Sequence, residues 1–275
     1  MSAVAVVTGA GRGFGLEIAR SLGARGYAVL VTDVDAAAAE AAAAEVGEGA
    51  WAMELDVRDP DAHRLAAAAA IERGPLEVWV NNAGVLRVDK PWNHSDHDVR
   101  LMVEANLLGV MWGSRAFVEA IAAGPSERAA HLINIASLSA FGPVPGLAVY
   151  AATKHGVLGF TTSLQGDLDA AGVAVRTHVV CPDTADTGMV REQAGQQEAA
   201  VQFSGPKVLS AAEVAERTVA LLGGERMVLS IPPARGLLVR SLAPWPRFGL
   251  RIASLFGRLG ERRRRRYLEQ LRPGS

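Results

Sequence analysis

The chain has only one cysteine, Cys181, among its 275 residues. A single thiol excludes an intrachain disulfide and is typical of a reducing compartment, so we expect a cytoplasmic protein. Long apolar runs are also lacking, since none reaches the ~18 residues that a membrane-spanning helix requires. The first apolar run begins at residue 3, so no signal peptide is expected. Aromatic residues make up 5% of the chain, which indicates a core of small aliphatic side chains.

Short apolar runs alternate with stretches of helical periodicity between residues 3 and 231. Strands are predicted at 3–8, 28–33, 50–55, 77–81, 130–136, 173–181 and 226–231. Helices are predicted at 14–24, 36–46, 61–72, 96–122, 149–171 and 211–222. This alternation indicates a parallel sheet with helices on both faces. We therefore predict one doubly wound, Rossmann-type α/β domain over residues 1–234, followed by a basic extension over 235–275.

A glycine-rich turn joins the first predicted strand to the first helix. Gly9, Gly11, Gly13 and Gly15 fall within seven residues, and Phe14 stands where the common GxGxxG fingerprint has its third glycine. Strand, glycine turn, helix and a second strand ending in an acid form the dinucleotide-binding βαβ pattern. The free N–H groups at the start of such a helix would face the pyrophosphate.

Two charged residues bear on the choice of cofactor. Asp33 closes the second strand, where a carboxylate can accept hydrogen bonds from both hydroxyls of the adenosine ribose and would repel a 2′-phosphate. Arg12, in the glycine turn, would instead favour a phosphate. We expect Asp33 to dominate, so NAD is predicted and NADP is the less favoured alternative.

Ser137, Tyr150 and Lys154 are the candidate catalytic residues. Tyr150 and Lys154 are four positions apart, so on a helix they share one face. A nearby ammonium favours a phenolate, and the pattern therefore predicts a tyrosine whose pKa is lowered enough to exchange protons near neutral pH. Ser137 would supply a second hydroxyl that holds the oxygen of a carbonyl or an alcohol.

Together these motifs resemble the short-chain dehydrogenase/reductase family over residues 3–231. The resemblance implies a cofactor site built from Thr8, Gly9, Gly13, Gly15, Asp56, Val57, Asn82, Ala83, Gly84, Pro182 and Thr187, with Arg12, Phe14 and Asp33 in the same site. It implies a catalytic tetrad of Asn106, Ser137, Tyr150 and Lys154, in which Lys154 also holds the nicotinamide ribose and Asn106 positions a water. Asp183 departs from the family, which usually has glycine at this position.

The predicted reaction is reversible hydride transfer between NAD(H) and a secondary alcohol or ketone. Apolar residues in the segments 138–148 and 184–208 favour a partly apolar substrate such as a lipid, terpene, steroid or aromatic alcohol. The alternatives are an NADP-dependent carbonyl reductase and a non-catalytic NAD-binding scaffold or sensor. The family resemblance also implies a homodimer or homotetramer.

Charge is distributed unevenly along the chain. Residues 235–275 contain eleven arginines, no lysine and only two acids, a net charge of +9, whereas the whole chain carries −1. Pro244 and Pro246 divide this tail, and a basic helix is predicted over 247–270. Three interpretations remain open: packing on the enzyme body or a second subunit, contact with an anionic membrane, or a lid over the substrate cleft. Nucleic acid binding is disfavoured because no recognition fold accompanies the arginines.

A cluster of possible ligands spans residues 94–98. His94, Asp96 and His97 could suggest a metal, but no further ligands lie nearby in the sequence. Ser95 followed by Asp98 fits a variant capping box at the start of the long predicted helix. We therefore predict a helix cap there and no metal site.

Overall fold

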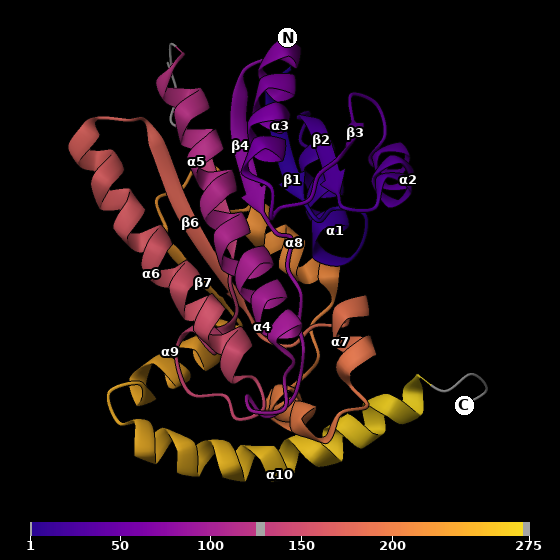
Figure 1. Cartoon of the computed structure of the whole chain (residues 1–275), viewed down its shortest axis with the longest axis vertical. Helices are drawn as coiled ribbons and strands as arrows, with labels where there is room; N and C mark the ends of the chain where they lie inside the picture. The colour runs from indigo at the N-terminus through magenta and orange to yellow at the C-terminus, as the bar shows by residue number, and fades with distance from the viewer. Residues whose placement is uncertain (1, 125–129, 272–275) are drawn as a thin grey trace.

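The computed structural model describes residues 2–124 and 130–271. Arg272, which belongs to the basic tail, lies outside the described residues. Seven parallel strands form one sheet in the order β3-β2-β1-β4-β5-β6-β7, as Figure 1 shows. The strands are β1 (Val4–Thr8), β2 (Ala28–Asp33), β3 (Trp51–Glu54), β4 (Leu76–Asn81), β5 (Ala130–Ile135), β6 (Val175–Pro182) and β7 (Val228–Ile231).

The order of the strands reverses between β1 and β4, because β1 pairs with β2 on one side and with β4 on the other. The helices at the carboxyl ends of the two strands diverge at this point to opposite faces, and the crevice they leave is where doubly wound sheets bind ligands. The topology therefore places the glycine turn after β1 directly opposite the segment that follows β4.

Helices cover both faces of the sheet. They are α1 (Gly13–Gly23), α2 (Ala36–Val46), α3 (Pro60–Arg73), α4 (Asp96–Val103), α5 (Gly109–Ala122), α6 (Ala148–Ala171), α7 (Gly188–Gln193), α8 (Ala211–Val219), α9 (Pro233–Leu242) and α10 (Pro246–Gln270). Shorter helical turns are η1 (Glu104–Leu108), η2 (Leu138–Ala140) and η3 (Gln197–Ser204).

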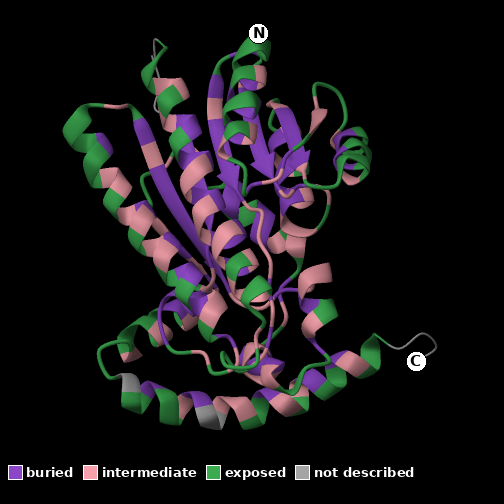
Figure 2. Ribbon diagram, viewed as in Figure 1, coloured by how far each residue is buried: buried purple, intermediate pink, exposed green. Residues whose placement is uncertain are grey.

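Alternate residues of the central strand β1 pack into two different hydrophobic cores. In β1, Ala5 and Val7 contact the core that includes Ile18 of α1, whereas Val4 and Val6 contact the core that includes Phe117 of α5. The central strands β1, β2, β4, β5 and β6 are mostly buried (Figure 2), which is why they read as continuous apolar runs in the sequence. The predicted α/β class and doubly wound parallel sheet are confirmed.

Buried polar groups also join the central strands. The Asn81 amide donates to Oδ1 of Asn134 at 2.8 Å and to the Ser114 hydroxyl at 3.1 Å, linking β4 to β5 and α5. Trp79 donates its indole N–H to Asn81 Oδ1 at 2.8 Å. These bonds satisfy the buried amide groups of Asn81 and Asn134. They also fix the carboxyl ends of β4 and β5, which lie next to the site.

The structure refines several predicted elements. The long helix expected at 96–122 is interrupted by η1, a π-helical turn. Ser95 caps its start as predicted, because its hydroxyl accepts from the Asp98 backbone N–H at 3.1 Å. The prolines of the tail separate α9 from α10 as predicted, but α9 begins at Pro233, so the expected boundary at residue 235 falls inside a helix.

The basic tail lies across the carboxyl end of the sheet. In Figure 1, α10 runs beneath α7 and the ends of α4 and α6, and α9 connects it to β7. Gly260 packs so closely that a Cβ there would collide with the carbonyl oxygen of Ala200 in η3. The tail is therefore packed on the enzyme body. None of the helices in the described part of the chain is long and apolar enough to cross a membrane.

Candidate active site

The glycine turn keeps side chains away from the carboxyl end of β1. Gly9 and Gly13 have φ values of 60° and 61°, which side-chain-bearing residues rarely adopt. A Cβ on Gly15 would lie 2.6 Å from Nδ2 of Asn82. These close approaches leave backbone, not side chains, along the start of α1, which fits the path of a dinucleotide pyrophosphate.

Thr8 and Asn82 join the ends of β1 and β4 behind this turn. The Thr8 hydroxyl accepts from the backbone N–H of Asn82 at 3.1 Å and of Ala83 at 3.2 Å. The Asn82 amide donates to the carbonyls of Thr8 and Gly9, each at 2.9 Å. Thr8 and Asn82, which the sequence predicted as cofactor-site residues, therefore also hold the glycine turn against the segment after β4.

Asp33 is fixed at the carboxyl end of β2. Its Oδ2 accepts from the Gly11 backbone N–H at 3.0 Å, which ties the acid to the glycine turn. Arg12 projects outward instead: its side chain is 74% exposed and lies 3.4 Å from Glu192 of α7. The acid is therefore held in place at the end of β2, while the arginine faces solvent and already has an anionic neighbour.

Asp56 and Val57 follow β3 at the same end of the site. Arg58 donates from Nε to the Asp56 carboxylate at 2.9 Å, and this hydrogen bond lowers the pKa of Asp56. Val57 is buried, and its carbonyl oxygen lies 3.0 Å from Nε2 of His63. Arg58, beside the predicted cofactor-site residue Asp56, is a feature that sequence reasoning missed.

Asn106 lies in the π-helical turn η1, and π turns are often found at functional positions. Its amide donates to the carbonyl of Val85 at 2.8 Å, and its Oδ1 accepts from the Val85 backbone N–H at 2.7 Å. Asn106 thus fixes the backbone after the Asn82–Gly84 segment. Its predicted role in positioning a water stays a prediction.

Ser137, Tyr150 and Lys154 come together as predicted. Tyr150 and Ser137 line the same cleft, and the ammonium of Lys154 lies 5.6 Å from the centre of the Tyr150 ring. Lys154 is buried and donates to the carbonyl of Ile135 at 2.9 Å. Ser137 follows β5, whereas the other two lie one turn apart on α6, so the sheet edge and one helix face assemble the group.

The expected lowering of the tyrosine pKa is corrected by the structure. Burial raises the pKa of Tyr150 to about 12, and the hydrogen bond from Ser137 opposes this rise. Burial likewise lowers the pKa of Lys154 to about 8. The charge of the lysine, which is visible in the sequence, favours a phenolate, but desolvation disfavours both charged forms. Tyr150 is therefore a protonated phenol at neutral pH, poised to donate.

The cofactor and catalytic residues share one cleft of about 470 Å³. Every predicted site residue lines it except Thr8, Gly15 and Asn106, which lie behind its wall. Phe14, Pro182 and Thr187 are among the lining residues, and the Thr187 hydroxyl also caps α7. The cleft runs from the glycine turn and Asp33 past Tyr150 to the basic tail.

Residues of the tail line the far end of this cleft, which is the position that the lid interpretation requires. The tail residues that line the cleft are mostly apolar and include Leu238, Val239, Leu242, Ile252 and Phe256. Those residues face Leu138, Val144 and Leu147 of the segment 138–148. The packing and lid interpretations therefore describe the same arrangement, because α9 and α10 reach the cleft by packing on the body.

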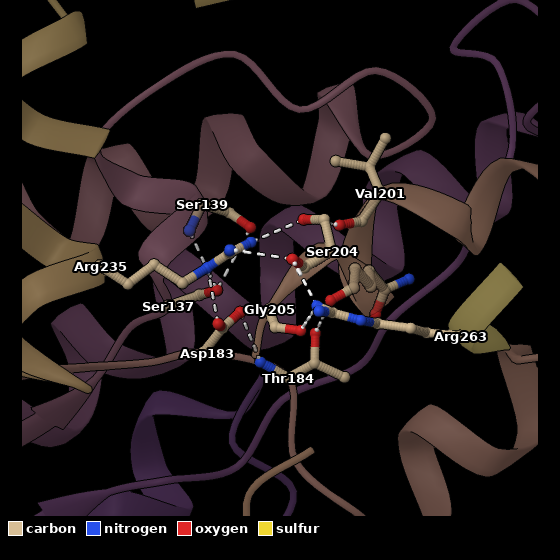
Figure 3. Close-up of polar contacts among 10 residues, drawn as sticks. Ser137, Ser139, Asp183, Thr184, Val201, Ser204, Gly205, Arg235 and Arg263 are labelled. Atoms are coloured by element: carbon tan, nitrogen blue, oxygen red, sulfur yellow. Dashed lines mark hydrogen bonds and ion pairs between the residues drawn. The ribbon is translucent and has the colours of Figure 1, made fainter. Parts of the chain in front are cut away.

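Asp183, where the family usually has glycine, pairs with the tail. Its carboxylate lies 2.6 Å from Nε of Arg235 in α9, and the two side chains are only 7% and 17% exposed. Arg235 also donates to the Ser204 hydroxyl at 2.6 Å, and Arg263 of α10 donates to the Ser204 carbonyl at 3.1 Å (Figure 3). Burial raises the pKa of Asp183, and the charge of Arg235 opposes this.

Comparisons with known proteins agree with this geometry. Residues 3–198 match the family model for short chain dehydrogenases. A 1-deoxy-11-beta-hydroxypentalenate dehydrogenase from Streptomyces arenae is 39% identical over 233 residues, which cover 82% of this chain and 80% of the relative.

Two solved structures share the fold. A short-chain dehydrogenase/reductase from Burkholderia phymatum in complex with NAD has a TM-score of 0.78 and 28% identity, over 87% of this chain and 92% of that one. A point variant of the actinorhodin polyketide ketoreductase with NADPH has a TM-score of 0.74 and 32% identity, over 84% and 95%. The chain therefore belongs to the short-chain dehydrogenase/reductase family, and it is an oxidoreductase that acts on hydroxyl or keto groups with a nicotinamide dinucleotide.

Proposed function

We propose that this enzyme transfers a hydride reversibly between NAD(H) and a secondary alcohol or ketone with a largely apolar skeleton. The observation that carries the choice of NAD is Asp33, whose carboxylate is held at the end of β2 by the Gly11 backbone N–H. A fixed carboxylate accepts hydrogen bonds from ribose hydroxyls and repels a 2′-phosphate. The apolar skeleton is inferred from the aliphatic and aromatic side chains that the tail adds to the cleft.

The chain's own residues divide the chemistry between them. A bound nicotinamide supplies or accepts the hydride. Tyr150 donates its phenolic proton to the substrate oxygen during reduction and takes it back during oxidation. Ser137, which lines the same cleft as Tyr150, holds the same substrate oxygen, and Lys154 places a buried positive charge beside the phenolate that forms. Lys154 would also hold the nicotinamide ribose.

Cofactor choice is tested by titrating the protein with NADH and NADPH. We expect NADH to bind at least about tenfold more tightly, a difference of about 1.4 kcal/mol. Asp33→Ala should reduce this preference to a few-fold, whereas Glu40→Ala, on the exposed side of α2, should leave it unchanged. Tighter binding of NADPH by the unmodified enzyme would overturn the assignment.

An NADP-dependent carbonyl reductase is the second candidate. It is favoured by the exposed guanidinium of Arg12 at the rim of the cleft and by the NADPH-bound ketoreductase of similar fold. In that case Arg12→Ala would weaken NADPH binding while Asp33→Ala had little effect. A scaffold without activity is the third, and NADH binding without turnover on any ketone of a broad panel would support it.

The substrate class is tested with ketones of graded size. We expect kcat/KM to rise from small aliphatic ketones to bicyclic and steroid ketones, because only the larger ones reach the side chains contributed by α9 and α10. The relative from Streptomyces arenae is named as a dehydrogenase of a hydroxylated compound, so the corresponding alcohols should be assayed with NAD. We also propose a homodimer or homotetramer, which light scattering in solution would reveal.

A further inference from the structure

The outer side of α10 is a surface that neither the fold nor the cleft uses. The inner side is buried at Ala253, Gly260 and Tyr267, and the opposite side faces solvent along the lower edge of the molecule in Figures 1 and 2. Because α10 spans Pro246–Gln270, this outer side extends for about 37 Å at 1.5 Å per residue.

Arginines occupy this outer side in a single row. Arg247, Arg251, Arg258, Arg262 and Arg265 are all exposed, and their spacings of four, seven, four and three residues place them on one helical face. We call these five residues the arginine row. The acids of α10 are only Glu261, which pairs with Arg265, and Glu269.

Two other arginines of α10, Arg263 and Arg264, point toward the enzyme body and bond to its backbone carbonyls. Arg264 is buried and donates to the carbonyl of Ala194 at 2.8 Å, and Arg263 donates to the carbonyl of Ser204. Packing therefore accounts for these inward arginines. It does not account for the arginine row, whose concentrated charge costs stability through mutual repulsion.

Exposed apolar side chains also occur on α9, at the turn that follows it and on the first residues of α10. Leu237, Leu238, Trp245, Phe248 and Leu250 are between 45% and 72% exposed. We call these five residues the apolar corner. Exposed apolar residues scattered singly are ordinary, but several of them on consecutive basic helices are typical of an interaction surface. Tryptophan and phenylalanine beside arginine suit the boundary between lipid headgroups and acyl chains.

We propose that the arginine row and the apolar corner dock this enzyme on an anionic lipid bilayer. The row would lie along the negatively charged headgroups, and the corner would insert its aromatic and leucine side chains below them. A second copy of the chain is a poorer occupant, because a two-fold contact would bring two arginine rows together and like charges repel. The phosphates of a nucleic acid would pair with the arginine row, but a nucleic acid would leave the apolar corner exposed to water.

Docking in this way would place the cleft at the membrane. Leu238 both lines the cleft and is 45% exposed in the apolar corner, so the two features meet at one residue. An apolar substrate dissolved in the bilayer would then reach the cleft without crossing water. This last consequence rests on the proposed function, whereas the docking itself does not.

The experiment is flotation of the full chain with vesicles. Vesicles of phosphatidylcholine alone are compared with vesicles containing roughly one-third phosphatidylserine, at low and high salt. We expect binding to the anionic vesicles only, and a loss of binding at high salt. Arg251→Glu/Arg258→Glu should weaken partitioning by more than about tenfold, because each basic residue near an anionic surface contributes roughly a fivefold factor.

Matched variants distinguish the surface from overall charge. Arg64→Glu/Lys90→Glu makes the same change in net charge on exposed residues of the body and should leave vesicle binding nearly unchanged. Trp245→Ser/Phe248→Ser tests the apolar corner and should weaken binding at equal charge. Circular dichroism and turnover of a water-soluble ketone without vesicles check that each variant remains folded, and they report on the proposed function independently.

Any of five results would overturn the proposal. The protein could fail to bind anionic vesicles, or it could self-associate through the arginine row in place of binding them. The body variant and the row variant could lose vesicle binding equally, or replacing Trp245 and Phe248 could leave vesicle binding unchanged. Capture by duplex DNA that displaces the vesicles without needing the apolar corner would identify a nucleic acid as the partner and count against the bilayer.

Discussion

Replacing Arg235 by methionine should destabilise the protein in a strongly pH-dependent way. The substitution keeps most of the aliphatic bulk of the side chain but leaves the Asp183 carboxylate buried without its cation. Removing one partner of a buried pair typically costs about 3–5 kcal/mol. The carboxylate can escape this penalty by taking up a proton, which sets a ceiling on the cost.

The ceiling follows from the ordinary pKa of an aspartate, about 3.9, and the cost of about 1.36 kcal/mol per pH unit. Protonation at pH 7 therefore costs about 4 kcal/mol, and at pH 5 only about 1.5 kcal/mol. Since the proton is held only by the folded variant, the loss of stability should shrink as the pH falls. We expect Arg235→Met to lose about 3–4 kcal/mol at pH 7 and less than half of that at pH 5.

Urea unfolding at the two pH values measures the effect, with Arg240→Met as the control. Arg240 lies on the same helix but is exposed over the Phe141 ring, so its loss should cost less than about 1 kcal/mol at either pH. Adding Asp183→Ala removes the buried charge, so Arg235→Met should then cost much less. A cost below about 1 kcal/mol at pH 7, or one equal at both pH values, would refute the ion-pair account.

Three further predictions concern the catalytic group, the lid and the far end of the sheet. Tyr150→Phe should abolish nearly all turnover while the NADH dissociation constant stays within about threefold, and a loss of NADH binding would make the tyrosine structural. Gly260→Ala should raise KM for large apolar ketones with NADH affinity retained, unlike Gly159→Ala, whose added methyl meets nothing. His131 and His178 are buried, stacked and 2.9 Å apart, and burial lowers the pKa of His131 to about 4 and that of His178 below its usual value. The folded state favours the neutral form of both rings, so their contribution to the free energy of unfolding is fully present above pH ~6.5. It is lost as the pH falls toward 4, and for His131 alone the loss should reach about 1 kcal/mol at pH 5.5. Imidazole ¹⁵N shifts showing both rings neutral at pH 5.5 would confirm this, and charged rings would contradict it.

The sheet and the catalytic group were predictable because local patterns encode them. Buried parallel strands read as apolar runs, and the spacing from Tyr150 to Lys154 fixes their shared helix face before any tertiary contact is known. The glycine turn likewise follows from backbone requirements at Gly9 and Gly13. In each case the information lies within a few residues of the feature.

The parts that escaped prediction depend on contacts between distant segments. Nothing in the sequence distinguishes Arg235 from the ten other arginines of the tail as the partner of Asp183. A helical pattern in the sequence does not reveal the π turn at Asn106. The pKa of Tyr150 was mispredicted because desolvation depends on the completed fold, whereas the lysine charge is visible in the sequence.

The tail has a consequence for how substrates are compared among relatives. The match to the family model ends at residue 198. The apolar end of the cleft is formed by α9 and α10, and the first of these helices begins only at Pro233. Two relatives could agree closely over the matched region, share the tetrad and the cofactor, and still accept unrelated molecules because their C-terminal helices differ. Exchange of this tail between relatives would then move substrate preference from one enzyme to another without touching the catalytic machinery.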